Sequence, residues 1–235
     1  MKRRNLGIGL LVISVLLIGI GVFAIGSGST SSGDVTSVEA ALRPSPTTTT
    51  EPPTATPSAA PEATTSTEQT VPVVQQISPP TGLRIKGLDV DAPVDAYGVD
   101  ANTGQMDVPD NTTDVGWYKF GPLPGESGSA VLAAHVDLAG SGPGVFFDLD
   151  TLEAGDPVVV LHEDGTESPF RVVARVTYDK QELPLDVIFS REGPPVLTLI
   201  TCGGAFNSNI SRYDSNVVVY AVPDLGTAPA GGSNL

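Results

Sequence analysis

The stretch VLTLITCGG, residues 196–204, decides the fold class and also holds the most reactive side chain of the chain. Its first six residues are only aliphatic residues and threonine, which is typical of a strand buried in a sheet. The run ends at Cys202, the single cysteine among 235 residues. Gly203 and Gly204 follow, and residues without a Cβ let another molecule approach the sulfur closely. We therefore expect a buried strand that ends at an accessible thiol.

Similar short runs recur through residues 81–223, separated by Gly, Pro and Asp. They lie at residues 83–86, 92–97, 129–134, 158–161, 170–176 and 216–221. The Asp164-Gly165 pair between two of these runs favours a tight hairpin turn. No amphipathic helical pattern exceeds a turn or two, and short helical turns are expected only near residues 145–152 and 185–189. The spacing predicts an all-β domain of about eight strands, closed as a barrel or packed as a sandwich.

The N-terminus has the pattern of a membrane signal-anchor. Residues 1–5 include Lys2, Arg3 and Arg4, and residues 6–26 carry no charged side chain. About 20 apolar residues in a helix span the hydrocarbon core of a bilayer, and preceding positive charges orient the N-terminus to the cytoplasm. We therefore expect a single-pass plasma-membrane protein whose folded domain lies outside the cell. The alternative is a cleaved signal peptide, whose apolar core is usually only about 7–15 residues long.

Residues 27–80 have the composition of a disordered linker. Nine of the 21 prolines of the chain fall within residues 43–80, among many Thr, Ser and Ala. Such a segment buries too little apolar surface to offset the entropy of ordering its backbone. Proline extends it, so we expect a stalk that holds the domain away from the membrane, either bare or O-glycosylated. Residues 224–235 are expected to form a flexible C-terminal tail.

Charge and residue counts exclude several functions. The chain has 12 Lys and Arg against 27 Asp and Glu, a net charge of −15. Binding to a nucleic-acid backbone needs clustered basic residues, so that function is excluded. One cysteine excludes an internal disulfide, and one cysteine with two histidines cannot complete a spaced zinc cluster. We expect no metal site and no cofactor.

A cysteine nucleophile needs partners, because only the thiolate attacks. His135 ends the apolar run at residues 129–134, where it is equally compatible with a structural and a catalytic role. Asp137, two residues later, is a candidate to orient it. His162 precedes a charged turn, so we expect it to be solvated. Arg212 follows Cys202 by ten residues, and its guanidinium is a candidate to stabilise a thiolate or an oxyanion.

These residues together resemble the sortases, membrane-anchored cysteine transpeptidases of Gram-positive surfaces. Residues 198–202, TLITC, match the TLxTC signature of the family, and Arg212 lies where its essential arginine is expected. Residues 134–137, 142–149 and 155–159 are similar to the histidine strand, the FxxL segment and the G-D-x-V turn. TCGG and the final NVVVYA are most similar to the class F sortases of actinobacteria.

The resemblance implies an eight-stranded sortase β-barrel over residues 81–223, with Cys202, His135 and Arg212 as catalytic residues. Cys202 would attack the Thr–Gly carbonyl of an LPxTG-like sorting signal and form a thioester. His135 would act first as acid and then as base, and Arg212 would hold the substrate or its oxyanion. Thr201 and Thr198 fall on the motif as candidate substrate contacts. The implied partners are LPxTG-like surface proteins and a peptidoglycan-precursor amine, another amine, or water, and we expect a monomer.

Three alternatives stay open. A thiol hydrolase differs only in passing the thioester to water. An L,D-transpeptidase also combines a β-domain with Cys and His, but its SHGC-x-R block is absent. In the third, the chain is a non-catalytic wall-binding or adhesion module on a stalk, with Cys202 buried. Trp117 is the one tryptophan, so the sequence offers no lectin-like aromatic platform for that function.

Overall fold

The computed structural model describes residues 31–43, 77–208 and 212–226. Eight long or medium strands form the body of the fold: β2 (Pro80–Ile85), β3 (Val90–Tyr97), β4 (Val115–Tyr118), β5 (Gly128–Ala133), β8 (Pro157–His162), β9 (Glu167–Asp179), β10 (Pro195–Asn207) and β11 (Arg212–Pro223). The smaller elements are β1 (Ser31–Gly33), α1 (Val35–Leu42), η1 (Lys86–Leu88), β6 (Asp137–Leu138), β7 (Gly142–Pro143), η2 (Leu149–Thr151) and α2 (Leu185–Ile188). The helical turns η2 and α2 lie in the two segments where the sequence predicts them.

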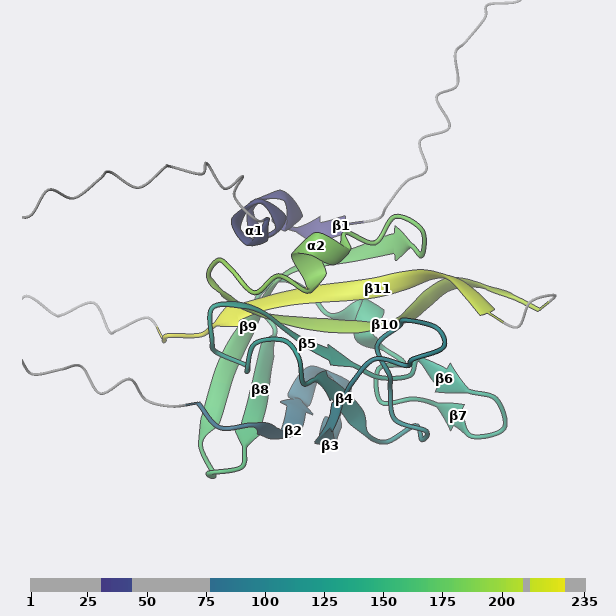
Figure 1. Cartoon of the computed structure of the whole chain (residues 1–235), viewed down its shortest axis with the longest axis horizontal. Coiled ribbons are helices and arrows are strands. Elements are labelled where there is room, and N and C mark those ends of the chain that lie inside the picture. Colours follow the sequence, from purple (N-terminus) through teal and green to yellow (C-terminus); the bar gives the residue numbers. More distant parts are fainter. Residues whose placement is uncertain (1–30, 44–76, 209–211, 227–235) are drawn as a thin grey trace, which may run out of the picture.

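The eight strands close into a barrel (Figure 1). Their order is β9-β11-β10-β5-β4-β3-β2-β8, and β8 pairs again with β9. Neighbours are antiparallel except for β3 with β4 and β5 with β10, which are parallel. The predicted hairpin is present as β8 and β9, and Gly165 in its turn has a φ of 80°. The prediction of an all-β, eight-stranded fold is confirmed.

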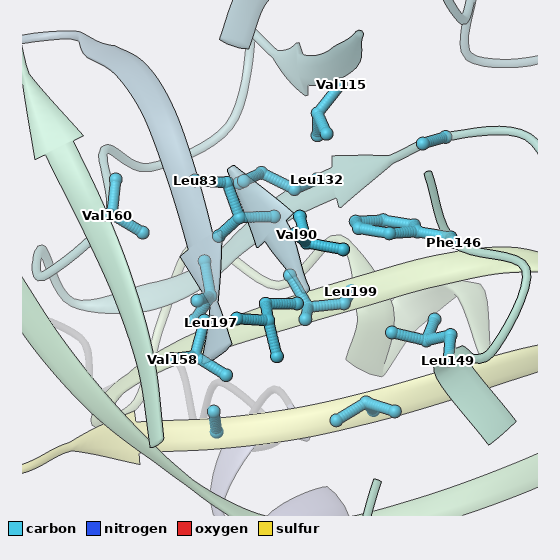
Figure 2. Packing of buried hydrophobic residues seen from close by; sticks show 14 of the residues in the cluster. Leu83, Val90, Val115, Leu132, Phe146, Leu149, Val158, Val160, Leu197 and Leu199 are labelled. Atoms are coloured by element: carbon cyan, nitrogen blue, oxygen red, sulfur yellow. The ribbon is translucent and has the colours of Figure 1, made fainter. Parts of the chain in front are cut away.

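The barrel interior is filled by aliphatic and aromatic side chains from all eight strands (Figure 2). Leu197 and Leu199 of β10 lie at its centre, beside Val217 and Val219 of β11, and all four are buried. Residues at every second position face inward, as the pleat of a strand requires. Each fully buried leucine stabilises the fold by about 1.5–3 kcal/mol relative to an exposed one. The interior therefore anchors β10, the strand that carries Cys202.

A second apolar cluster lies on the outer face of β9, β11 and β10. Residues 31–43 cover it: α1 buries Leu42 completely and packs Val35 and Val38 against the cluster. The prediction of a disordered linker is therefore wrong for residues 31–43. The physical reason is the helical spacing of these three apolar residues, together with Asp34, whose side chain caps α1 by accepting from the Ser37 backbone N–H.

The strand β1 extends the barrel sheet. β8 pairs with residues 167–171 of β9, whereas β1 pairs with residues 174–176 farther along the strand. The Tyr178 hydroxyl of β9 donates to the Glu39 carboxylate of α1, and burial followed by this hydrogen bond raises the pKa of Tyr178. The segment 31–43 thus protects the part of the β9 edge that β8 leaves unpaired.

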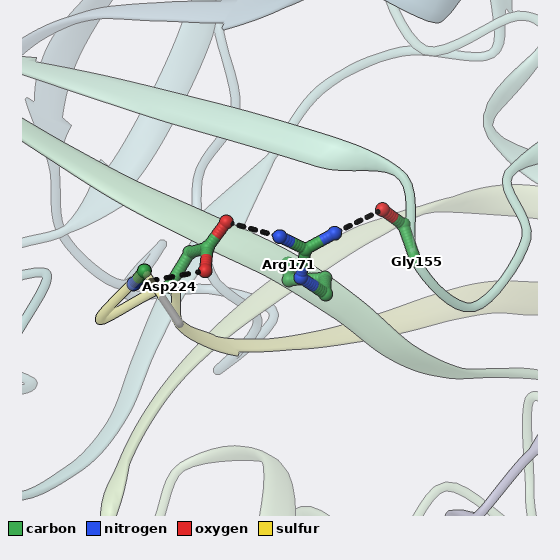
Figure 3. Close-up of polar contacts among 4 residues, drawn as sticks. Gly155, Arg171 and Asp224 are labelled. Carbon is green, nitrogen blue, oxygen red and sulfur yellow. Dashed lines mark hydrogen bonds and ion pairs between the residues drawn. The ribbon is translucent and has the colours of Figure 1, made fainter. Parts of the chain in front are cut away.

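Polar contacts join β9 to the turn before β8 and to the residues that follow β11 (Figure 3). The Arg171 guanidinium of β9 donates to the Gly155 carbonyl at 3.1 Å and to the Asp224 carboxylate. The Asp224 backbone N–H also donates to the Pro169 carbonyl at 2.9 Å. An exposed ion pair of this kind stabilises a protein by about 0–1 kcal/mol. Asp224, expected to begin the flexible tail, is held by the barrel.

None of the helices in the described residues is long and apolar enough to cross a membrane. The expected span at residues 6–26 lies outside the described residues, as do residues 44–76 of the expected stalk and residues 227–235 of the tail.

Candidate active site

The sequence predicts that Cys202 lies at the end of a strand. In the structure it lies within β10, which continues to Asn207. β5 pairs with β10 only as far as Ala133 opposite Ile200, and beyond this point β10 continues to Asn207 with β11 as its partner. The Ala134 backbone N–H still donates to the Ile200 carbonyl, at 3.3 Å. In this parallel register Cys202 and His135 each stand two residues beyond the last paired residues. The end of β5 therefore brings the thiol and the imidazole to the same place.

The backbone conformation after Cys202 requires a glycine at position 204. A bulge separates the pair Gly203–Ser215 from the pair Phe206–Tyr213. Gly204 has a φ of 77°, and a Cβ there would lie 2.1 Å from an Asp214 carboxylate oxygen. Only glycine adopts this conformation without strain. Conformation and close packing, rather than room for a substrate, require a glycine at 204.

His135 is half-buried and firmly held. Its Nε2 lies 2.8 Å from the Pro109 carbonyl oxygen, so Nε2–H donates and the neutral ring leaves Nδ1 as the acceptor. The His135 carbonyl accepts from the Phe146 backbone N–H at 3.2 Å. A Cβ at Gly144 would lie 2.2 Å from this same carbonyl oxygen. The segment 142–149 therefore fixes the position of His135.

His162 is buried, so the prediction of a solvated side chain is wrong. Its Nδ1–H donates to the Ser78 carbonyl at 2.7 Å, and its Nε2 pairs with the Ser168 hydroxyl at 2.8 Å. Residues 77–79, which precede β2, bond to His162 and to the Glu163 backbone N–H, whereas the charged turn itself stays exposed. His162 joins this segment to the β8–β9 hairpin and takes no part in the site.

A cavity of about 740 Å³ connects Cys202 with His135. The hairpin β6–β7 forms much of its wall, with aromatic side chains from three further segments. The lining residues are His135, Val136, Asp137, Leu138, Ala139, Gly140, Gly142, Pro143, Phe147, Cys202, Phe206 and Tyr213. This lining combines a thiol and an imidazole with apolar surface, as nucleophilic catalysis on a bound substrate requires.

Tyr213 and Asp137 join the two sides of the cavity. The Tyr213 hydroxyl donates to the Asp137 carboxylate at 2.6 Å, and the Tyr213 ring packs edge-on against Phe206. The hydrogen bond to Asp137, followed by desolvation, raises the pKa of Tyr213. Asp137 thus binds Tyr213 in this structure, in place of the contact with His135 that we considered.

Arg212 is exposed at the start of β11, opposite Asn207. It stands four residues before Asn216, the residue paired with Cys202, which corresponds to about 13 Å along a strand. It is not among the residues that line the cavity. The cation beside the sulfur is instead Lys180, whose Nζ lies 3.6 Å from Sγ of Cys202. A catalytic role for Arg212 stays a prediction.

The two threonines of the motif have internal partners. Thr198 is fully buried, and its hydroxyl forms a 2.7 Å hydrogen bond with the Ser129 hydroxyl. Thr201 is buried as well and donates to the Ala134 carbonyl at 2.8 Å, next to His135. The structure gives both residues a role in joining β10 to β5, in place of the substrate contact that we expected.

Comparison with known protein families agrees with this architecture. The family model "Sortase domain" matches residues 83–224, more than half of the chain. The chain belongs to the sortase family. Sortases are cysteine transpeptidases, and the cavity of this sortase contains the cysteine and the histidine that such an enzyme needs. No curated protein sequence matches the chain.

Solved sortase structures resemble the chain at low sequence identity. A lid mutant of sortase A from Corynebacterium diphtheriae is 19% identical, with a TM-score of 0.48, covering 67% of this chain and 76% of its own. Sortase C-1 from Actinomyces oris is 24% identical, with a TM-score of 0.47 and coverage of 60% and 72%. Sortase C1 from Streptococcus suis is 20% identical, with a TM-score of 0.48 and coverage of 64% and 75%.

Sequence reasoning missed several residues of this sortase site. Lys180 is separated from Cys202 by 22 residues, and nothing in its surroundings marks it. Pro109 contributes only a backbone carbonyl, which no side-chain pattern reveals. Tyr213 is the one residue of this set that the sequence could have indicated, because it is adjacent to the candidate Arg212 and its side chain points to the opposite face of the strand.

Proposed function

We propose that this sortase cleaves an LPxTG-like sorting signal between Thr and Gly through a thioester on Cys202, and that it is a class F-like enzyme. The observation that carries the proposal is the parallel register of β5 and β10, with His135 and Cys202 on one cavity. The apolar side chains Leu138, Phe147 and Phe206 offer surface for the Leu and Pro of such a signal.

In the first step the Cys202 thiolate attacks the carbonyl carbon of Thr in the Thr–Gly peptide bond. A C–S bond forms, and the electron pair of the carbonyl moves to oxygen. Collapse of this intermediate breaks the C–N bond, and His135 donates a proton to the leaving amine. Since Nε2–H donates to Pro109, we assign this proton to Nδ1, which takes it from the Cys202 thiol when the thiolate forms. The product is a thioester with the residues up to Thr.

In the second step an acceptor amine attacks the thioester carbonyl. His135 now accepts the amine proton, the new C–N bond forms, and the C–S bond breaks to return the thiolate. A peptidoglycan-precursor amine completes a transpeptidation, and water in its place completes a hydrolysis. Arg212 is exposed and adjoins the cavity residue Tyr213 in the sequence, and it is the proposed contact for the substrate or its oxyanion.

We also propose that the enzyme is anchored in the plasma membrane by residues 6–26, with the barrel outside the cell. Support comes from the uncharged stretch and the preceding basic residues. β1 begins five residues after position 26, a reach of at most about 17 Å. Docking of residues 31–43 therefore holds the barrel near the bilayer, and residues 44–76 connect α1 to β2 rather than setting the height of the barrel.

Intact-mass spectrometry of the full chain in detergent, incubated with an LPxTG peptide, tests the catalytic proposal. We expect an added mass equal to the peptide truncated after Thr less one water, and no adduct on the Cys202→Ala variant. Adding candidate amines then separates transpeptidation from hydrolysis. If no sorting peptide yields an adduct or a cleavage product, and the folded protein resists alkylation, the wall-binding module becomes the better explanation.

A further inference from the structure

We propose that Lys180 is a further catalytic residue, whose ammonium group stabilises the reactive sulfur of Cys202 as a thiolate. The contact is direct: the Lys180 Nζ donates to the Cys202 Sγ at 3.6 Å. The proposal rests on Cys202 being the nucleophile, and it requires no particular peptide substrate.

Sheet geometry explains why these side chains meet. Cys202 of β10 pairs with Asn216 of β11, and Asn216 pairs with Tyr178 of β9, so the three residues form one row across the sheet. Lys180 follows Tyr178 by two residues and therefore projects from the same face of the sheet. Its backbone N–H donates to the Asp214 carbonyl at 3.1 Å, which fixes the base of the side chain.

The other charged or titratable groups around the sulfur leave this role to Lys180. Tyr213 donates to Asp137, and the Nε2–H of His135 donates to Pro109. Asp214, on β11, accepts from the Ser215 hydroxyl at 2.9 Å. Neither Arg212 nor Lys180 is among the residues that line the cavity, but in the described part of the chain only Lys180 has a side-chain hydrogen bond to Sγ. Among the described residues, no ion pair within 4 Å includes Lys180.

An ammonium group suits this task because it carries three donors and no acceptor. In the resting enzyme it favours the thiolate over the thiol. When the C–S bond forms, the negative charge moves from sulfur to the carbonyl oxygen. Lys180 keeps all three protons throughout, while His135 supplies the proton to the leaving amine. The two residues therefore have separate functions, electrostatic stabilisation and proton transfer.

The alkylation rate of Cys202 by iodoacetamide, measured as a function of pH on the full chain in detergent, tests the proposal. Cys202 is the only cysteine, so the signal is unambiguous. In Lys180→Met we expect the midpoint of the profile to move to higher pH, because the unbranched apolar side chain preserves size but not charge. Since Lys180 is exposed to solvent, we expect about a two- to five-fold loss of thiolate at neutral pH and of kcat/KM.

Three controls make the outcome decisive. Lys180→Arg, which keeps the charge, is expected to restore the profile, and Lys86→Met, at an exposed lysine of η1, to leave it unchanged. The midpoint of the pH profile is compared, and not the alkylation rate itself, because a less basic thiolate is also a weaker nucleophile and the rate would combine both effects. Urea unfolding checks that the variants are folded, and Lys180→Gln replaces Lys180→Met if the latter is not. A folded, uncharged variant with the parent profile overturns the proposal, even where its peptide cleavage is reduced. Because alkylation needs no substrate, failure to cleave LPxTG peptides would leave this result interpretable.

Discussion

The two faces of the β9-β11-β10 ribbon are closed in different ways. The inner face, with Leu197 and Leu199, is covered by strands of the barrel itself. The outer face, with Val218 and Tyr220, is covered by α2 and by α1, which joins β2 through residues 44–76. Cys202 follows Ile200 on this outer face, just beyond the covered cluster. Packing of the inner face holds the strands in register. The outer face is uncovered at the end that carries Cys202, where the cavity of the candidate active site lies.

The largest effect that separates the two faces is expected at His135. His135→Ala removes the proposed proton carrier from the open end of the outer face, where the side chain is only half-buried. We expect kcat to fall by about 10²- to 10⁴-fold, the usual contribution of general acid–base catalysis. Steady-state cleavage of a sorting peptide measures this loss, while urea unfolding should show little change. His162→Ala is the matched control, and a similar loss of kcat there would remove the distinction between the two histidines.

On the inner face the expected loss is in stability. Leu199→Ala leaves a cavity at the centre of the barrel, where the side chain is fully buried. We expect the free energy of unfolding to fall by about 2–5 kcal/mol. Urea titration followed by circular dichroism provides the measurement, with Leu225→Ala as a control because Leu225 is 91% exposed. Equal midpoints for the two variants would mean that the interior does not hold the barrel together.

Leu42→Ala tests whether the cover of the outer face belongs to the folded domain. Leu42 is fully buried, but it belongs to a helix of eight residues at the periphery. We therefore expect a loss near the lower limit for such a change, about 2 kcal/mol. Hydrogen exchange should accelerate first in residues 174–176 of β9, which pair with β1. If exchange there matches the parent while urea stability is unchanged, residues 31–43 are not part of the domain.

The barrel was predictable because its signals are local. Runs of β-branched residues and the Asp164-Gly165 turn indicate strands and a hairpin without reference to the rest of the chain. The segment 31–43 was also detectable, from the spacing of Val35, Val38 and Leu42 and the cap at Asp34. This pattern was missed because the composition of residues 27–80 was considered as a whole, and the proline-rich residues after position 43 dominate it.

The site depended on pairings between distant segments. His135 meets Cys202 because β5 and β10 are parallel neighbours, although 67 residues separate the two side chains. Lys180 reaches the sulfur across β11, and His162 is buried by residues that precede β2. Apart from a hairpin turn, local patterns contain no information about which strands become neighbours. The sequence indicated Cys202 and His135 as candidates, and the resemblance to the sortases gave them their expected roles, whereas the contacts that hold and tune them required the fold.

The smallest expected effect concerns the hydrogen bond that joins Tyr213 to Asp137 across the open cavity. Because the folded pKa of Tyr213 is raised above the unfolded value, the bond stabilises the fold fully below about pH 10. That stabilisation is lost as the pH rises through the folded pKa. The ring is partly exposed, so the effect on stability is small, and we expect the clearest signal in the ultraviolet titration of the phenols. Tyr213→Phe should remove one late ionisation among the five tyrosines. Asp137→Ala should let Tyr213 ionise at lower pH, because it removes the hydrogen-bond acceptor that is the main cause of the shift. An unchanged titration in Asp137→Ala would show that the hairpin β6–β7 is not held to β11 by this bond, and that the outer face is open along a longer edge than the structure indicates.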